Sequence, residues 1–296
     1  MKGFWLLCFF AGYFTICHAG QVYKYKDDNG NWVFGDKPPN KEQKFETLKF
    51  ATVKKPTSKI KLNYVKNNEG FTLHAKNTFF TPIEIEIKHS DTKALLRKII
   101  PARSSTELFH SAKKKKNLKY RWVLGDPTSI ADNYQYHAPF SSPKEHRVTQ
   151  AFNGKFSHTN DYNKYAVDMD VGTYLTAVRS GTIIWVNDNY HMSGTSNYFL
   201  DKANRIKVLH DDGTFSLYAH ILMDTALVKV GDKVVVGDRL ARSGSSGFST
   251  GPHLHFAIIK NVGFKNIAIP FKFIDNNGSA FTPKRAMTMV GASKPL

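Results

Sequence analysis

Two histidines stand two residues apart in the segment Gly244-Ser-Ser-Gly-Phe-Ser-Thr-Gly-Pro-His-Leu-His-Phe256. The residues around His253 and His255 are apolar and typical of a β-strand, in which positions i and i+2 lie on the same face. Both imidazoles are therefore expected to point the same way, while Leu254 points into the core. Two aligned imidazoles suit a metal ion such as zinc, which binds nitrogen, oxygen or sulfur ligands.

A zinc site needs three or four ligands, and a catalytic zinc keeps one position for water, so other segments must complete the site. The segment Tyr218-Ala-His220 offers one more histidine at the end of a hydrophobic run. Residues 157–173 offer a histidine and three aspartates: His158, Asp161, Asp168 and Asp170.

These three segments, in this order, resemble the motifs of the lysostaphin/LytM-type zinc metallopeptidases, which cut peptide cross-links in bacterial cell walls. The motifs are a His followed by an Asp, a Tyr-x-His segment, and a closing His-x-His preceded by Gly-Pro. The resemblance extends roughly from Phe140 to Phe273, and residues 228–240 are similar to the family's hairpin before its glycine-rich turn. It implies a peptidoglycan endopeptidase domain of the duplicated hybrid motif type.

Carried over residue by residue, the resemblance implies that His158, Asp168 and His255 are the zinc ligands, and that His220 and His253 are catalytic residues beside the open position. Zinc lowers the pKa of its bound water from ~15.7 towards ~7. A neutral imidazole can then take the water proton, and an imidazole N–H can stabilise the tetrahedral oxyanion. We assign these two tasks jointly to His220 and His253.

More than one aspartate could be the carboxylate ligand. The loop between His158 and Asp168 is longer than in most of the family, and the segment from Asp168 to Gly172 is short, which leaves Asp170 as a second candidate. The two aspartates would share a strand face, so alternation does not separate them. We favour Asp168 over Asp170, with Asp161 third.

The catalytic domain is predicted to span residues 140–275 and to consist of antiparallel strands, because few helical periods appear in it. Candidate strands span 181–186, 205–210, 215–220 and 253–259. His210 precedes Asp211-Asp212-Gly213, a strong turn signal, so it is predicted to flank a turn and not to bind metal. Residues 276–296 are predicted to form a C-terminal tail that packs little.

Two further modules are expected upstream. Asn29-Gly30 lies between strand-like residues 21–26 and 31–34, which predicts a hairpin in a small β module over residues 20–50. This module is similar to one common after the signal peptide in Gram-negative envelope proteins.

Residues 59–138 contain short strands separated by turn residues. Ile83, Ile85 and Ile87 alternate with Glu84, Glu86 and Lys88, which predicts a strand buried on one face only. We interpret this region as an immunoglobulin-like β-sandwich. The fold class of the whole chain is therefore predicted to be mainly β.

Residues 1–19 carry Lys2, a short apolar run and Cys17-His-Ala19, which together predict a secretory signal peptide cleaved after Ala19. The predicted location is the periplasm, with secretion as the alternative. The run is shorter than the ~20 residues of a membrane span and no other segment is more apolar, so no transmembrane anchor is expected after cleavage. Both cysteines, Cys8 and Cys17, lie in this segment, so the zinc site is expected to lack thiolates.

The chain has 42 Lys and Arg against 24 Asp and Glu, a formal net charge of +18. A positive field attracts polyanions, so peptidoglycan and anionic envelope polymers are the predicted partners. Nucleic acid is not expected, because no nucleic-acid-binding motif is present.

The sequence predicts an exported endopeptidase, with one Zn²⁺ per chain, that hydrolyses peptide bonds in peptidoglycan stem peptides or cross-links. The alternative is a catalytically silent member of the same fold that binds peptidoglycan or activates an amidase. Such members lose zinc ligands, and none is obviously missing here.

Overall fold

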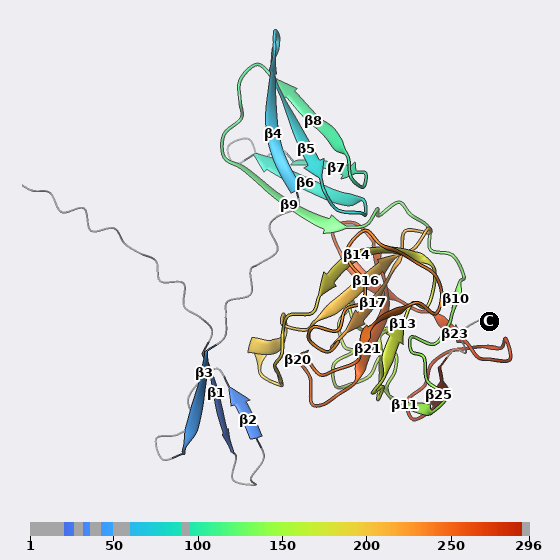
Figure 1. The fold of residues 1–296 in the computed structure, drawn as a ribbon. Helices are drawn as coiled ribbons and strands as arrows, with labels where there is room; N and C mark the ends of the chain where they lie inside the picture. The colour runs from blue at the N-terminus through green and yellow to red at the C-terminus, as the bar shows by residue number, and fades with distance from the viewer. Residues whose placement is uncertain (1–20, 27–31, 36–42, 50–59, 90–94, 292–296) are drawn as a thin grey trace, which may run out of the picture. The chain divides into compact units, whose positions relative to one another are not determined.

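The structure is a computed structural model that describes residues 21–26, 32–35, 43–49, 60–89 and 95–291. The chain divides into two compact units, residues 1–54 and 55–296, which are treated separately (Figure 1). The predicted signal peptide, residues 1–19, lies outside the described residues. In the part of the chain that the structure describes, no helix has the length and apolar character to cross a membrane.

The first unit contains a three-stranded antiparallel sheet with the order β2-β1-β3. Its strands are β1 (Gln21–Lys26), β2 (Trp32–Gly35) and β3 (Phe45–Lys49). β1 and β2 pair as the predicted hairpin, although the Asn29-Gly30 turn lies outside the described residues. The sequence did not reveal β3, which pairs with the other edge of β1 and places Phe45 edge-to-face with Tyr23 at 5.4 Å between ring centroids.

The second unit begins with two three-stranded antiparallel sheets, ordered β4-β5-β8 and β7-β6-β9. The strands are β4 (Ile60–Asn67), β5 (Gly70–Asn77), β6 (Ile83–His89), β7 (Leu95–Ile100), β8 (Ser105–Ser111) and β9 (Leu118–Leu124). The chain crosses between the sheets after β5, β7 and β8, and the two sheets share one core that includes Leu73, Ile85 and Ile100. This arrangement confirms the predicted immunoglobulin-like sandwich.

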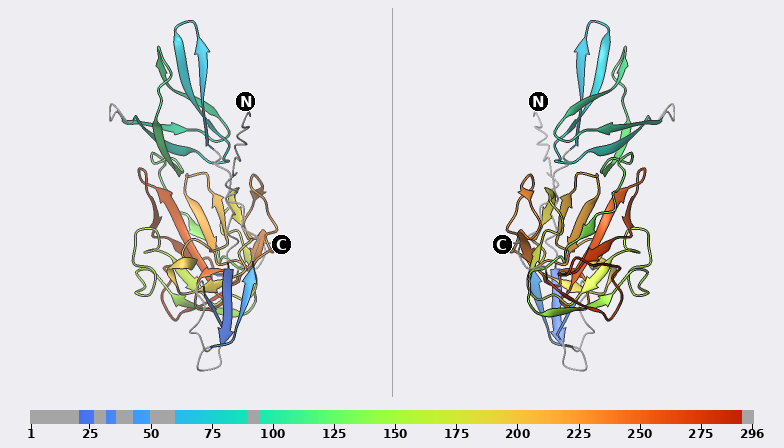
Figure 2. Two further views of the ribbon diagram at one scale, coloured as in Figure 1. Left: turned by 90° about the vertical axis from the view of Figure 1, so that its left-hand side faces the viewer. Right: turned by 90° about the vertical axis from the view of Figure 1, so that its right-hand side faces the viewer.

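The rest of the unit is built on a nine-stranded sheet of order β18-β14-β16-β17-β21-β12-β11-β25, with β22 paired to β21. Figures 1 and 2 show its central strands running side by side, coloured yellow to orange. Its strands are β11 (Glu145–Gln150), β12 (Val167–Met169), β14 (Gly181–Asn187), β16 (Arg205–Leu209), β17 (Phe215–Ala219), β18 (Lys233–Val234), β21 (Leu254–Asn261), β22 (Asn266–Ile269) and β25 (Thr288–Val290).

Both faces of this sheet are apolar at its centre. Tyr218 and Phe256 belong to a core on one face, whereas Leu217 and Ala257 belong to a second core on the other. Strands buried on both faces read as continuous apolar runs, which explains why 215–220 and 253–259 were recognisable in the sequence. The central sheet is therefore a rigid support for side chains at its strand ends.

Short elements complete the domain around this sheet. β10 (Gln135–Tyr136), β23 (Lys272–Ile274) and β24 (Ala280–Phe281) form a small sheet, β13 (Tyr174–Thr176) pairs with β19 (Arg239–Arg242), and β15 (Ser193–Gly194) pairs with β20 (Gly247–Phe248). One turn of 3₁₀ helix, η1, spans Asn197–Phe199.

The predicted hairpin over residues 228–240 is wrong, because its two strands join different sheets. β18 pairs with β14, and β19 pairs with β13. Each of the two Gly-Asp pairs forms its own tight turn, in which the aspartate carboxylate accepts a backbone hydrogen bond from three residues earlier. Lys229 N donates to Asp232 Oδ2 at 2.9 Å, and Val235 N donates to Asp238 Oδ2 at 2.8 Å. Two successive turns redirect the chain twice and separate the strands.

The expectation that the chain after residue 275 packs little is also wrong. β25 pairs with β11, and Met289 is only 5% exposed within the main core. The segment therefore forms part of the domain, and residues 292–296 lie outside the described residues.

The polar side of β6 is covered as well, contrary to the prediction of a strand buried on one face. Glu84 and Glu86 are 7% and 9% exposed. The Glu84 carboxylate accepts hydrogen bonds from Asn261 Nδ2 at 3.1 Å and Phe264 N at 2.6 Å, in the turn between β21 and β22. Glu86 lies between two arginines. A buried carboxylate is tolerated when such partners satisfy it, and alternation in the sequence does not reveal them.

Candidate metal centre and its cleft

The strand register places two of the predicted ligands opposite each other. Asp168 of β12 pairs with His255 of β21, and Gln150 of β11 lies across from Asp168 on its other side. The third residue, His158, belongs to the loop between β11 and β12, where its backbone N–H donates to Gly154 O at 3.0 Å. Three segments far apart in the sequence thus meet at one end of the sheet.

The ligand atoms of His158, Asp168 and His255 lie within 4.8 Å of one another. Asp168 Oδ1 is 3.2 Å from His158 Nε2 and 2.9 Å from His255 Nδ1. All three residues are buried, with exposed fractions of 8% or less. The other candidate carboxylates lie elsewhere.

This geometry fits a zinc ion. In a tetrahedral site with zinc–nitrogen bonds of about 2.0–2.1 Å, neighbouring ligand atoms are roughly 3.3 Å apart. The two separations between Asp168 and the histidines are close to this value, and the donor set of two imidazole nitrogens and one carboxylate oxygen leaves a fourth position open. His158 Nδ1 donates to Ala151 O at 2.9 Å, which fixes the ring so that its Nε2 faces Asp168.

The carboxylate is held in its charged form. Burial disfavours the charge on Asp168, but hydrogen bonds from His158 and His255 outweigh it and hold the pKa of Asp168 well below its usual range. Asp168 is therefore held as an anionic oxygen ligand near neutral pH.

Gln150 is the residue that the sequence did not reveal. Its side-chain Nε2 donates to Asp168 Oδ2 at 2.8 Å and to Ser157 Oγ at 2.8 Å, and its Oε1 accepts from Phe156 N at 3.1 Å. One buried amide thus orients the carboxylate and ties it to the loop that carries His158. One feature of the sequence could have indicated it. Gln150 is polar but stands two positions after buried Val148, where period-two alternation predicts an apolar residue.

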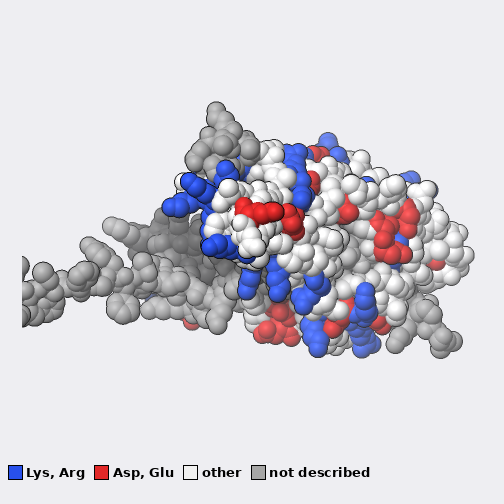
Figure 3. All heavy atoms as spheres, turned by 90° about the horizontal axis from the view of Figure 1, so that it is seen from above, with Lys and Arg blue, Asp and Glu red and all other residues white. Residues whose placement is uncertain are grey.

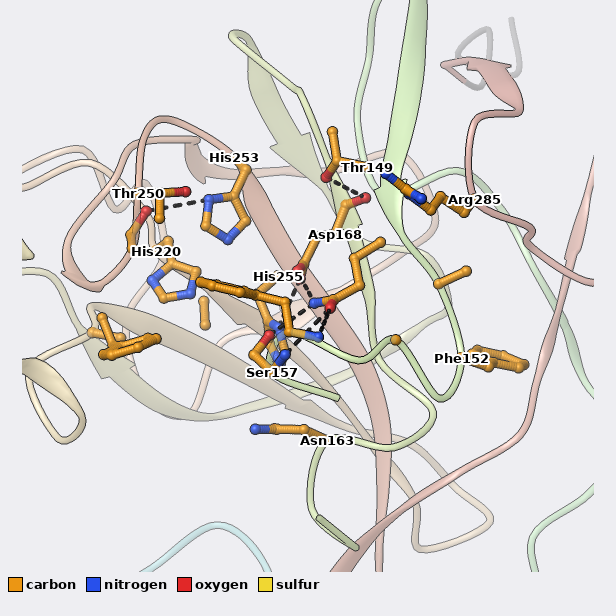
Figure 4. A pocket seen from close by; sticks show the side chains of 18 of the residues that line it. Thr149, Phe152, Ser157, Asn163, Asp168, His220, Thr250, His253, His255 and Arg285 are labelled. Atoms are coloured by element: carbon orange, nitrogen blue, oxygen red, sulfur yellow. Dashed lines mark hydrogen bonds and ion pairs between the residues drawn. The ribbon is translucent and has the colours of Figure 1, made fainter. Parts of the chain in front are cut away.

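A second pair of histidines faces the same cleft, beside the three-residue cluster (Figure 4). The ring centroids of His220 and His253 are 4.6 Å apart, and those of His220 and His255 are 5.9 Å apart. His220 follows β17 with φ of 63°, a left-handed conformation that is rare for a residue with a side chain and is typical of strained functional positions.

Backbone carbonyls fix the tautomers of this pair. His220 Nδ1 lies 2.7 Å from Ser246 O, and His253 Nδ1 lies 2.8 Å from Gly251 O. A carbonyl only accepts, so each Nδ1 carries a proton, and in a neutral ring the lone pair is on Nε2. Burial lowers the pKa of His220 to about 3, which keeps this imidazole neutral near pH 7.

The two rival aspartates are engaged outside the cluster. Asp170 Oδ1 accepts a hydrogen bond from Arg147 N at 2.6 Å, and half of its side chain is exposed. Asp161 forms ion pairs with Lys265 and Lys164, which lower the pKa of Asp161 to about 2.

His210, predicted to flank a turn, lies at the β16–β17 turn with Nδ1 2.9 Å from Ser180 O.

The cluster and the histidine pair open into one groove with a volume of about 1360 Å³. Part of its wall is apolar: Phe156 and Leu200 line it and are 68% and 61% exposed, and Phe156 lies beside Phe248 at 6.4 Å between centroids. An open groove of this size admits an extended polymer segment next to the cluster.

The structure thus defines an antiparallel β domain with a buried His/Asp/His cluster in an open cleft. Residues 162–267 match Peptidase family M23, and residues 6–59 match a domain of unknown function, DUF4124. Residues 162–267 lie within the β domain that carries the cluster, so this part of the chain is similar to Peptidase family M23. His158 lies four residues before the matched range, in the loop that the structure brings to the cluster.

Among curated proteins, the chain is similar to the glycyl-glycine endopeptidase ALE-1 of Staphylococcus capitis, with 37% identity over 40% of this chain and 31% of that protein. It is similar to lysostaphin of Staphylococcus simulans, with 37% identity over 38% of this chain and 22% of that protein. The chain thus spans less than a third of the length of these relatives. Among solved structures, the catalytic domain of lysostaphin from S. simulans is 28% identical, with a TM-score of 0.29 over 50% of this chain and 95% of that chain.

Proposed function

We propose that this chain is an exported zinc metalloendopeptidase that hydrolyses peptide bonds in peptidoglycan stem peptides or their cross-links. The observation that carries the proposal is the joint presence, in one groove, of a complete ligand set and of two imidazoles with free lone pairs. Two relatives are named glycyl-glycine endopeptidase and lysostaphin, and these names support the proposal that the bond cleaved is a peptide bond.

His158, Asp168 and His255 would hold the zinc ion, with Gln150 orienting the carboxylate. When bound there, zinc supplies Lewis acidity, which polarises a carbonyl and makes a water molecule acidic enough to lose its proton near neutral pH.

His220 and His253 would move that proton. Because each Nδ1 is already committed to a backbone carbonyl, each ring can act towards the groove only through Nε2. An Nε2 lone pair accepts the water proton, and the same ring then has an Nε2–H that can stabilise the oxyanion or protonate the leaving amine. The two tasks assigned jointly to this pair would therefore follow one another in time.

A periplasmic location is part of the proposal. It is supported by the signal-like residues 1–19 and by the module that follows them, and secretion is the alternative destination. The net charge of +18 favours contact with the anionic envelope polymers expected there.

The test is to incubate purified sacculi with the zinc-loaded mature chain, with and without a chelator, and to identify new amino termini in the products by mass spectrometry. Wild-type chain should release peptides in a chelator-sensitive manner, whereas His220→Ala and His253→Ala should bind zinc but cleave at least ~10²-fold more slowly. Zinc-loaded chain that releases nothing would support the silent, peptidoglycan-binding alternative.

A further inference from the structure

We propose that the groove contains a carboxylate-binding subsite formed by Lys284 and Arg285, which selects substrates that carry a free carboxylate beside the scissile bond. The inference rests on the proposed peptidase function of the cluster and names a substrate feature that this function leaves open.

The charge of the groove differs from that of the domain around it. Residues 126–290 contain 17 Lys and Arg against 14 Asp and Glu, which is close to balance. The residues that line the groove include four cations, and Asp168 is their one acid. The face drawn in Figure 3, seen from above, carries both acidic and basic side chains. The groove therefore has a local excess of positive charge.

Three of the four cations are available to a ligand. Arg205 is engaged with the backbone, since its Nε donates to Ala203 O at 3.1 Å. Lys155, Lys284 and Arg285 are exposed, and within the described residues none of them forms a side-chain ion pair. Their charges are compensated by solvent alone, so an anion that enters the groove gains favourable contacts without breaking existing ones.

The backbone holds Lys284 and Arg285 next to the cluster. Ala286 N donates to Val148 O at 2.8 Å, and Val148 N donates to Met287 O at 2.9 Å, which fixes this segment along β11. Val148 lies two residues before Gln150, whose amide contacts Asp168. Figure 4 shows Arg285 beside Thr149, on the side of Asp168 opposite to His220 and His253.

The turn itself is constrained, which fixes the backbone positions from which the two cations extend. Ala286 has φ of 71°, a conformation that alanine rarely adopts, and the two backbone hydrogen bonds to Val148 maintain it. Pro283 is buried, and β25 anchors the following residues to β11. A guanidinium and an ammonium at a fixed edge of the groove suit a carboxylate, which Arg can bind through two parallel hydrogen bonds.

The substrate class follows from this placement. A stem peptide carries carboxylates that are not consumed in its backbone amides, and one of these can reach the cationic edge while the scissile carbonyl lies at the cluster. Because the carboxylate does not change during hydrolysis, the subsite contributes equally to the ground state and the transition state. Its loss should therefore raise KM and leave kcat nearly unchanged.

The experiment compares zinc-loaded wild type with the double variant Lys284→Gln/Arg285→Gln on two substrates, soluble cross-linked muropeptides with free carboxylates and the same material after amidation. Lys229→Gln/Lys272→Gln is the matched control, since it removes two exposed charges outside the groove. Binding of a monomeric muropeptide, free or amidated, is measured by calorimetry with the same proteins.

We expect amidation to raise KM of the wild type about tenfold, as for the loss of one charge-assisted hydrogen bond. The double variant should show the same high KM on both substrates, Arg285→Lys should keep part of the preference, and the control should resemble the wild type. Equal KM on free and amidated material for the wild type would overturn the subsite and leave the peptidase intact.

If no protein cleaves either substrate, the peptidase proposal fails and calorimetry still decides the subsite. Tighter binding of the free muropeptide by wild type than by the double variant would support it, and equal affinities would overturn it.

Discussion

Asp168 in the cleft and Glu86 in the sandwich are both buried carboxylates on β-strands, but their partners differ. Glu86 accepts hydrogen bonds from Arg97 Nε at 2.8 Å and Arg121 Nε at 2.7 Å. Guanidinium groups are always charged, so the carboxylate is neutralised permanently. Asp168 is instead surrounded by two imidazoles and the neutral amide of Gln150.

The partners of a buried carboxylate therefore distinguish a structural carboxylate from a metal-binding one. Histidine can release its proton, so the surroundings of Asp168 can offer lone pairs and a negative charge to a cation. The surroundings of Glu86 offer neither. We therefore expect substitutions near Asp168 to change metal binding, and substitutions of the acids on β6 to change only stability.

The largest effect is expected at the cluster. His255→Ala removes one ligand, so zinc content should fall from about one per chain to near zero, and peptide hydrolysis should fall by at least ~10³-fold. His253→Ala, two residues away, is the matched control for zinc content, because it leaves the three ligand residues in place. Elemental analysis with an activity assay checks both, and a His255→Ala chain of full activity would contradict the assignment.

Gln150→Ala should have a smaller effect on the same site. Without the amide, Asp168 Oδ2 and Ser157 Oγ each lose the hydrogen bond that Gln150 Nε2 donates to them. The zinc dissociation constant should then rise about 10- to 100-fold. Competition with a fluorescent chelator measures this constant. Gln135→Ala serves as the control, since Gln135 is the exposed residue of β10. Unchanged zinc affinity with reduced stability would assign Gln150 a structural role alone.

Glu84→Ala should affect stability and not the metal. It removes the acceptor of Phe264 N and one of the two acceptors of Asn261 Nδ2, which also donates to Gly125 O at 3.0 Å, at the contact between the sandwich and the β21–β22 turn. Unsatisfied buried donors cost about 1–3 kcal/mol, so the free energy of unfolding in urea should fall by this amount while zinc content stays at the wild-type level. A loss of zinc would mean that the sandwich helps to form the cluster.

The smallest effect concerns pH. Burial lowers the pKa of His210 from 6.5 to about 4, so the folded state binds this proton less readily than the unfolded state. The contribution of His210 to the free energy of unfolding is therefore fully present above pH 6.5, and it is lost as the pH falls towards 4. His210→Gln should therefore reduce the loss of unfolding free energy between pH 7 and pH 5 by on the order of 1 kcal/mol, with His191→Gln as an exposed control. An unchanged pH dependence would exclude His210 as its source.

Periodicity was sufficient for the strands that are buried on both faces and for the Ile83–Ile87 strand of the sandwich. It did not reveal what covers the polar side of β6, because Asn261 and Phe264 are 177 and 180 residues away in the sequence from Glu84. The two Gly-Asp turns were likewise taken for one hairpin, since turn residues indicate a reversal of the chain but not which sheet receives the next strand.

At the site, the order of the motifs indicated which histidines are candidate site residues. The sequence did not decide which aspartate joins them, and the fold did. Asp168 and Asp170 are equivalent by alternation, yet β12 ends at Met169, and Asp170 turns to the backbone of Arg147. Gln150, Lys284 and Arg285 belong to no recognisable sequence motif. Their proximity to Asp168 arises from the pairing of β11 with β12 and β25, which a single sequence does not contain.

The most direct test of the account is zinc analysis of the purified mature chain combined with muropeptide release from peptidoglycan, before a chelator, after it, and after zinc is restored. We expect about one zinc per chain, and release that disappears with the chelator and returns with zinc. A chain that takes up no zinc under metal-replete conditions, or that cleaves equally well without it, would contradict the metal centre on which the account is built.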